Sequence, residues 1–360
     1  MKFLTLLFST GQYRQLSGIL ARAVNLCAAA VAVWVVYSAT MGTGDLFAMT
    51  ITFLSVMMAL LFLLYGATAA ADTTRPSLLD FLFAATSLAA GVYFTLNSES
   101  IINRVSLMDP LSGYDILFGS IIFVLTMEAT RRTIGMALTL IVLVFVAYNL
   151  MGHHLGGAAG HGQISYQHFL DLMVFTTDGI FGVPLRVAAT YVFLFVLFGT
   201  FLTRCGGGEF FFNLAAALTG RKVGGPAKVA VVSSGLYGTI SGSPTSDVVV
   251  TGAVTIPMMR RLGYPAALAA GVEVTASTGG GLLPPVMGSA AFIMAEYTGI
   301  SYRDIALAAT IPSLLYFVGV YTQVHLRSLR LGLGAMAEKD IPKLGPTLRH
   351  GMPFYVPLAV

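Results

Sequence analysis

The chain has 360 residues, of which 56% are hydrophobic and 10% are charged, and its formal net charge is +4. Because soluble globular proteins carry about 25% charged residues, this composition excludes a soluble domain and predicts an all-α polytopic membrane protein in a lipid bilayer. The basic residues stand in short clusters between apolar runs, so nucleic acid is not an expected partner, and two cysteines support neither a disulfide framework nor a zinc site.

Seven apolar runs are long enough to cross a bilayer, which takes roughly 20 helical residues. The N-terminus is expected in the cytoplasm, because Arg14 and Arg22 flank the first run and Arg131 and Arg132 follow the fourth. The expected spans are residues 17–38, 46–65, 78–96, 113–130, 134–151, 183–203 and 304–326.

The connectors between these runs differ in character. Residues 97–113 are rich in Asn, Ser, Pro and Gly, which predicts a loop outside the membrane. Between the fourth and fifth runs, Glu128 precedes Arg131 and Arg132 at the spacing at which a helix brings side chains together. We therefore expect Glu128 to pair with either arginine at a tight turn, with one long tilted helix as the alternative.

Four histidines lie in a glycine-rich connector, residues 151–169: His153, His154, His161 and His168. No cysteine or i, i+4 histidine pair organises a metal site there, so a solvated loop is preferred over metal binding. Residues 167–184 then predict an interfacial helix that leads into the sixth run, because Asp171 and Asp178 interrupt its apolar residues.

Residues 229–257 are bounded by Lys228 on one side and by Arg260 and Arg261 on the other, which places both ends on the cytoplasmic face. A segment that enters and leaves on one side is a re-entrant hairpin rather than two crossings. Its middle, GTISGSPTSD, has the Gly, Ser and Pro content of a turn.

Residues 266–298 predict two helical halves separated by STGGGLLPP, residues 277–285. Three glycines remove side-chain support, and Pro284 and Pro285 each lack a backbone donor and clash with the preceding turn. The helix is expected to break at mid-membrane.

Such breaks are costly, because each unpaired peptide group in hydrocarbon costs several kcal/mol. Carbonyl groups at a half-helix C-terminus can coordinate a small cation, and N–H groups at a half-helix N-terminus can receive an anion. Two breaks in one chain therefore predict an ion-coupled transport site. The alternative, that the glycines only pack against neighbouring helices, suits isolated glycines such as Gly66 or Gly91 better than GGG followed by PP.

Two acidic residues fall inside these elements. Asp247 lies just past the hairpin tip beside several hydroxyl side chains and is the stronger candidate for ion binding. Glu273, in the first half of the broken helix, is expected to bind a proton or sodium, or to pair with a basic residue. Glu296 and Asp304 lie near a membrane surface, where a solvated role is favoured.

The run GGPAKVAVVSSGLYGTISGSPTSDVVVTGAVTIPMMRRLGY, followed by VEVTASTGGGLLPPVMGSAAFIMAEYTGISY, resembles the large membrane subunit of tripartite ATP-independent periplasmic (TRAP) transporters. The chain looks most similar to the fused permeases of the TAXI-type branch, in which the small four-helix subunit precedes the large one. The resemblance runs from about Glu128 to Leu333, and residues 1–125 match only as a hydropathy pattern.

The resemblance implies a sodium-driven importer of organic acids, not an enzyme, in the bacterial inner membrane. It also implies a separate periplasmic binding protein that delivers the solute, and no cofactor beyond Na⁺ as the coupling ion. At the hairpin tip of this chain, Pro244 to Asp247 follow SGS, and this sequence differs from that of many relatives. The set of sodium ligands at the tip therefore stays open. The implied substrate- and ion-binding residues are Ser241, Gly242, Ser243, Thr245, Ser246, Asp247, Ser277, Thr278, Gly279, Gly280, Gly281, Leu283, Pro284 and Pro285. The implied sodium ligands among them are Ser241, Ser243, Asp247, Gly280, Leu283 and Pro285.

The expected organisation has about nine membrane-embedded elements, which are seven spans, one re-entrant hairpin and one broken helix, and forms one half of an inverted-repeat transporter. The expected regions are a small-subunit-like part (1–130), a connecting span with loop and interfacial helix (131–182), the first half of the large permease (183–333) and a connector (334–360). Because the apolar run at residues 352–360 has about half the length of a crossing, the chain is expected to be the N-terminal part of a longer protein.

Two other classes remain as alternatives. A divalent-anion/sodium symporter of the wider ion-transporter type would share hairpins and breaks but would need no binding protein, and a single-protein liposome uptake assay separates the two. A membrane-embedded enzyme would need a convergent acid, base or metal set, and the sequence has no HExxH, paired Asp motif or GxSxG in such a position.

Overall fold

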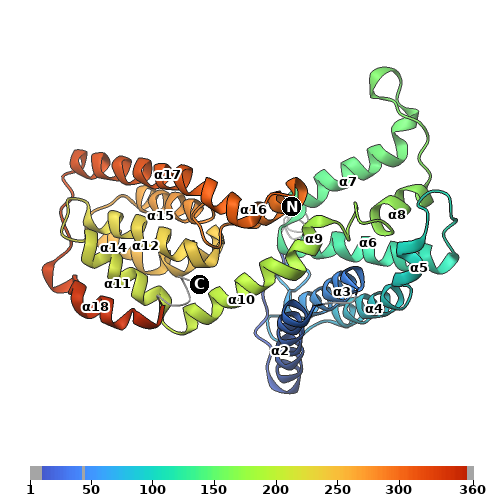
Figure 1. The fold of residues 1–360 in the computed structure, drawn as a ribbon, viewed down its shortest axis with the longest axis horizontal. Coiled ribbons are helices and arrows are strands. Elements are labelled where there is room, and N and C mark those ends of the chain that lie inside the picture. Colours follow the sequence, from blue (N-terminus) through green and yellow to red (C-terminus); the bar gives the residue numbers. More distant parts are fainter. Residues whose placement is uncertain (1–9, 43–44, 355–360) are drawn as a thin grey trace. The chain divides into compact units, whose positions relative to one another are not determined.

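The computed structural model describes residues 10–42 and 45–354, and every regular element within these ranges is a helix (Figure 1). The chain divides into two compact units, Met1–Thr190 and Tyr191–Val360. Residues 355–360, which hold most of the terminal apolar run, lie outside the described residues. The all-α class is confirmed.

The seven expected membrane spans are confirmed as helices long and apolar enough to cross a bilayer. These spans are α2 (Gly18–Met41), α3 (Leu46–Leu64), α4 (Leu78–Leu96), α6 (Gly113–Thr133), the continuous stretch of α7 (Met136–Met151) and η1 (Gly152–His154), the continuous stretch of α9 (Val183–Val187), η3 (Ala188–Val192) and α10 (Phe193–Arg204), and α17 (Tyr302–Arg330). The other helices are α5 (Ser98–Asn103), η2 (Gly157–Ala159), α8 (Tyr166–Val174), α11 (Gly207–Thr219), α12 (Gly225–Ser241), α13 (Pro244–Val250), α14 (Gly252–Arg261), α15 (Ala266–Gly280), α16 (Ser289–Thr298), η4 (Glu338–Asp340) and α18 (Leu344–His350).

In the first unit, α3 and α4 pack closely through small residues. A side chain at Gly91 would collide with Ser55, and the hydroxyl of Ser87 donates to the Ser55 carbonyl oxygen at 2.9 Å. Gly91 is therefore a helix-packing residue. Around this contact lies an apolar core whose fully buried members include Ile51, Phe62, Phe94, Ile122 and Leu170.

The connectors of the first unit follow the expectations in part. α6 ends at Thr133 and α7 begins at Met136, with Gly135 at φ +111° between them, so the junction is a turn rather than one long helix. Glu128 accepts from both Arg131 Nε (2.7 Å) and Arg132 Nε (2.8 Å), as predicted. The loop predicted for residues 97–113 instead contains the short helix α5.

A buried ion network joins the N-terminal segment to three helices of this unit. Arg14 Nη2 and Arg132 Nη1 each lie 2.7 Å from a different carboxylate oxygen of Asp80, and all three side chains are buried. Arg14 also donates to the carbonyl oxygens of Phe62 and Leu63. These two carbonyl groups lie in the last turn of α3, where the helix itself supplies no N–H partner. These partners compensate for the cost of burying the charges.

The histidine-rich connector contains two short 3₁₀ turns, and no group of three or more potential metal ligands occurs in the described ranges. Downstream, Asp171 of α8 accepts from Arg104 at 2.8 and 3.0 Å and from the Leu107 N–H at 2.8 Å. Burial alone would raise the pKa of Asp171, but the hydrogen bonds from Arg104 and Leu107 outweigh it and hold the pKa below its ordinary value.

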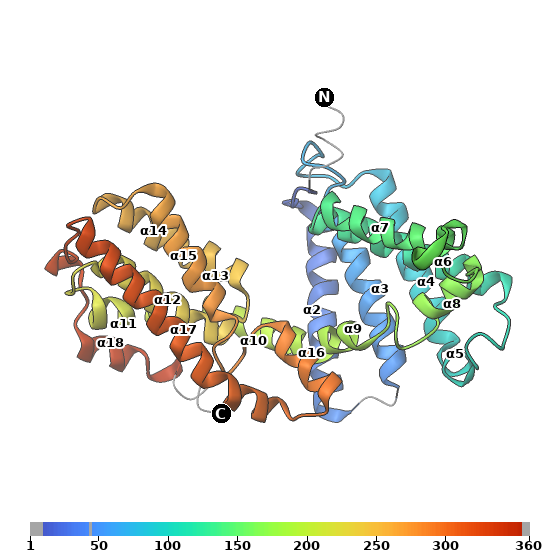
Figure 2. The same cartoon turned by 90° about the horizontal axis from the view of Figure 1, so that it is seen from above.

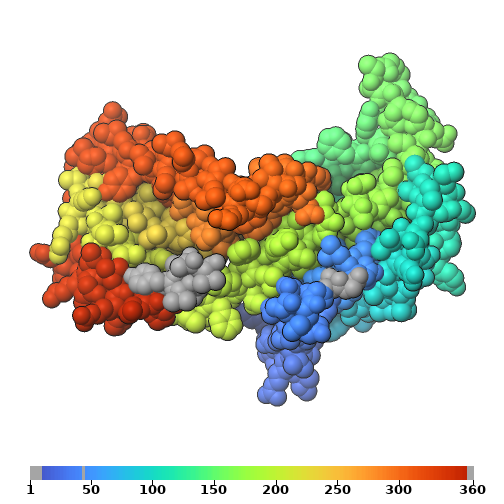
Figure 3. All heavy atoms as spheres, in the orientation of Figure 1, coloured from blue at the N-terminus to red at the C-terminus, as the bar shows by residue number. Residues whose placement is uncertain are grey.

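In the second unit, α12 packs against α11, α15 and α17, and α15 also contacts α13 and α14 (Figure 2). In the space-filling view, α17 borders one side of this unit and α18 the opposite side (Figure 3). Much of α17 exposes apolar side chains, among them Ile311 and Leu315. Such a surface is suited to lipid.

Candidate functional site

Helices α12, α13 and α14 form the predicted hairpin. α12 ends at Ser241, its C-cap residue Gly242 has a φ of +57° that favours glycine, and Ser243 is the N-cap of α13. The two ends of the hairpin meet again, because Tyr264 after α14 hydrogen-bonds Ser328 at 2.8 Å and a side chain at Gly224 before α12 would touch the same serine. The hairpin thus opens at one end, while its re-entrant placement in a bilayer stays a prediction.

The broken helix is present, but its break lies further along the chain than expected. α15 continues through Ser277 to Gly280, and the interruption covers residues 281–288 before α16 begins. The prediction that residues 277–280 lie in the break is wrong. Glycine costs a helix about 1 kcal/mol relative to alanine, and close packing of Gly279 against Tyr316 and of Gly280 against α12 offsets that cost.

The hairpin tip and the break lie against each other. A Cβ atom at Gly280 would stand 2.8 Å from Gly238 Cα and 2.7 Å from Asp247 Oδ2, so the helices approach to backbone contact. The N–H of Val286 in the break donates to the Thr239 carbonyl oxygen at 3.1 Å. Gly242 at the tip lies directly against the Met287 carbonyl oxygen, so only glycine fits.

Asp247 lies at the centre of this contact and is fully buried. Its Oδ1 accepts from the Ser241 hydroxyl, whereas its Oδ2 has no hydrogen-bond partner among the described residues. A buried carboxylate oxygen without a partner is expensive. The Gly281 carbonyl oxygen accepts from the Gly288 N–H at 2.7 Å, and the Gly242 carbonyl oxygen also faces Gly288 beside the tip. Oxygen atoms of this kind are ligands for hard cations.

The other predicted site residues divide by position. The side chains of Thr245, Ser246 and Thr278 are exposed, and the Thr278 hydroxyl donates to the Val274 carbonyl of its own helix at 2.7 Å. The Pro285 carbonyl accepts from the Tyr302 hydroxyl at 2.8 Å. The residues that the structure gathers at the contact between tip and break are Ser241, Gly242, Ser243, Asp247, Gly280 and Gly281.

Glu273 is the centre of a second buried cluster that the sequence analysis did not assemble. Four hydroxyl groups surround its carboxylate, and we call them the hydroxyl cage: Ser234, Thr251, Thr255 and Ser277. Asp247, Thr251 and Thr255 follow one another at four-residue intervals, which places them on one helix face. This four-residue spacing is the signal in the sequence from which the cluster could have been predicted.

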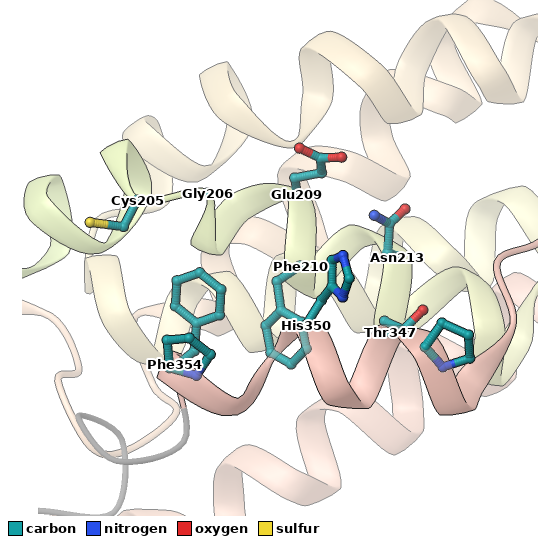
Figure 4. A pocket seen from close by; sticks show the side chains of 10 residues that line it. Cys205, Gly206, Glu209, Phe210, Asn213, Thr347, His350 and Phe354 are labelled. Atoms are coloured by element: carbon teal, nitrogen blue, oxygen red, sulfur yellow. The ribbon is translucent and has the colours of Figure 1, made fainter.

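The second unit also has a hollow of about 440 Å³ between α11 and α18. Figure 4 shows Glu209 and Asn213 on α11 and Thr347 and His350 on α18 along its sides. None of the predicted site residues lines this hollow. We therefore place the candidate site at the hairpin tip.

Comparison with known proteins matches residues 121–360 to the model of the DctM component of tripartite ATP-independent periplasmic transporters. The chain is 31% identical over 153 residues to the C4-dicarboxylate TRAP transporter large permease protein DctM of Pseudomonas aeruginosa, covering 41% of this chain and 35% of that protein. It is 37% identical over 91 residues to the protein of the same name from Rhodobacter capsulatus, covering 25% and 21%.

A further relative is the 2,3-diketo-L-gulonate TRAP transporter large permease protein YiaN of Escherichia coli, which is 30% identical over 122 residues, or 34% of this chain and 28% of that protein. The chain thus matches about a third or less of the length of these relatives.

Proposed function

Because the chain belongs to the family of DctM components of tripartite ATP-independent periplasmic transporters, we propose that it forms part of the permease of a sodium-driven importer of organic acids. The family consists of transporter permeases rather than enzymes, and the seven apolar helices make the chain a multi-pass membrane protein. We place it in the bacterial inner membrane with a cytoplasmic N-terminus, as a fused permease of the TAXI-like branch.

The observation that carries the sodium proposal is the unpartnered Oδ2 of Asp247. This oxygen is fully buried between the hairpin tip and Gly280, and no basic side chain pairs with it in the described part of the chain. A desolvated monovalent cation would satisfy it, with further oxygens supplied by the Ser241 hydroxyl and by backbone carbonyls of the tip.

The proposed solute class follows from the family and from the names of relatives, which act on C4-dicarboxylate and on 2,3-diketo-L-gulonate. Both names denote organic acids. The family name also supports a periplasmic receptor as the partner that delivers the solute. The second half of an inverted repeat would complete the solute pocket.

Uptake by proteoliposomes tests the proposal. The transporter that contains this chain is reconstituted, and uptake of a labelled C4-dicarboxylate is measured with and without an inward sodium gradient and with and without the receptor. We expect uptake only when both the sodium gradient and the receptor are present, and we expect Asp247→Asn to abolish this uptake. Sodium-independent uptake would contradict the ion assignment, and full uptake without a receptor would favour the symporter alternative.

A further inference from the structure

Glu273 is a buried carboxylate with no counter-ion. Its exposed fraction is 0%, and no ion pair joins it to a lysine, arginine or histidine among residues 10–42 and 45–354. An ionised carboxylate so placed is stabilised only by hydrogen bonds, unless it takes up a cation or a proton.

The hydroxyls of the cage lie at hydrogen-bond distance from the carboxylate. Ser234 Oγ lies 2.9 Å from Glu273 Oε1, and Thr251 and Thr255 contact Oε1 and Oε2 directly. Both carboxylate oxygens therefore already have hydroxyl partners, and a proton on either oxygen would lie within reach of a hydroxyl oxygen that can accept it.

Each threonine of the cage has a second acceptor within reach. Thr251 Oγ1 lies 2.7 Å from the Asp247 carbonyl oxygen, and Thr255 Oγ1 lies 3.0 Å from the Thr251 carbonyl oxygen. When Glu273 is ionised, both hydroxyls can donate to it. When Glu273 is protonated, it can donate to one hydroxyl, and that hydroxyl can turn to its backbone carbonyl. The cage therefore accommodates both states without leaving a donor unsatisfied.

The cage also adjoins the sodium site of the proposed function. Thr251 contacts both the Glu273 carboxylate and the Asp247 backbone, and the Ser234 carbonyl faces Gly280 beside Asp247 Oδ2. Two buried carboxylates with shared neighbours repel each other when both are ionised, and a cation on one favours ionisation of the other.

The remaining titratable groups on the packed elements are engaged elsewhere. Lys228 of α12 contacts His325 of α17 at 3.0 Å and the Tyr321 ring, Tyr237 bonds Thr203, and Tyr316 donates to the Thr275 carbonyl. Arg260 and Arg261 are exposed at the end of α14. Asp247 is thus the titratable group that faces the cage.

We propose that Glu273 in the hydroxyl cage is a proton-binding site whose proton passes to water when a sodium ion binds at Asp247. The reaction conserves charge, because one Na⁺ enters as one H⁺ leaves the carboxyl group. This inference rests on the proposed sodium site and adds a second ion to the coupling.

Calorimetry of sodium binding tests the exchange in the whole transporter. NaCl is titrated into the detergent-solubilised protein in two buffers with different ionisation enthalpies, so that the difference in heat counts the protons released. We expect up to about one proton per Na⁺ for the wild type, sodium binding without proton release for Glu273→Gln, and no change for Glu296→Gln, an exposed control on α16.

The outcomes separate the two proposals. Sodium binding with buffer-independent heat in the wild type, or proton release that persists in Glu273→Gln, would overturn the proton site and leave the sodium site intact. Absence of any sodium heat would overturn the sodium site instead. Infrared spectroscopy then tests protonation independently of sodium binding. The C=O band of the protonated Glu273 carboxyl group should be absent in Glu273→Gln.

If Glu273→Gln does not fold, Thr255→Val replaces it. This variant removes a hydroxyl that donates to the carboxylate, so fewer protons should be released per Na⁺ than in the wild type. An unchanged number of released protons would contradict the role of the cage.

Discussion

Replacing Gly280 with alanine tests the backbone contact between α12 and α15. The added methyl group would lie 2.8 Å from Gly238 Cα and 2.7 Å from Asp247 Oδ2, and Gly238 Cα is a backbone atom that cannot turn aside as a side chain can. Overpacking of this kind costs about 1–3 kcal/mol, against at most about 1 kcal/mol gained from replacing glycine in a helix. We expect a net loss of about 1–2 kcal/mol.

The same substitution should weaken sodium binding, because the methyl group occupies the space beside the unpartnered carboxylate oxygen. We expect the sodium Kd to rise at least about tenfold, which corresponds to 1.4 kcal/mol. Calorimetric sodium titration and thermal unfolding in the absence of sodium measure the two quantities separately.

Gly271 supplies the matched control on the same helix. A methyl group there meets no heavy atom within 4 Å, so Gly271→Ala should retain sodium binding and gain up to about 1 kcal/mol of stability. If Gly280→Ala binds sodium as well as Gly271→Ala does, the contact between tip and break is not part of the ion site.

Three further predictions concern stability and topology. Asp80→Asn removes the carboxylate between two buried guanidinium groups, so thermal unfolding should show a loss of about 3–5 kcal/mol. The pKa of Asp171 is lowered in the folded protein, so its contribution is complete above the unfolded pKa near 4 and is lost as pH falls through the folded pKa. Asp171→Asn should therefore flatten the acid limb of stability. Single cysteines at Lys222 and Arg261, both exposed beside the hairpin, should label from the same membrane face.

Each of these has a control or a contrary outcome. Asp178→Asn on an exposed turn should change stability by no more than about 0.5 kcal/mol, and an equal effect for Asp80→Asn would refute the buried ion network. An unchanged acid limb in Asp171→Asn would show that other carboxylates control it. Labelling of the two cysteines from opposite faces would refute the hairpin.

The spans and the hairpin could be predicted because their signals are local. Apolar runs of about 20 residues specify spanning helices by length alone, and the Gly242 turn lies in the predicted segment GTISGSPTSD. The pairing of Glu128 with two arginines followed from helical spacing. These features require no knowledge of the rest of the fold.

The break in α15 was misplaced because distant contacts decide it. Gly279 and Gly280 favour a break by propensity, but their contacts with α17 and α12 keep them helical, and the interruption shifts toward the prolines. The cage around Glu273 was missed for a related reason. Ser234 lies 39 residues from Glu273 in sequence, and no local pattern encodes that contact.

The position of Arg14 has a consequence for the order in which the first unit is completed during synthesis. Arg14 leaves the ribosome before every helix that binds it, yet its carboxylate partner, Asp80, is shared with Arg132. Until residue 132 has been translated, Asp80 lacks one of its two cationic partners. The N-terminal segment and the end of α6 are therefore held by the same carboxylate, so the contacts of the N-terminal segment are complete only after α6 has been translated.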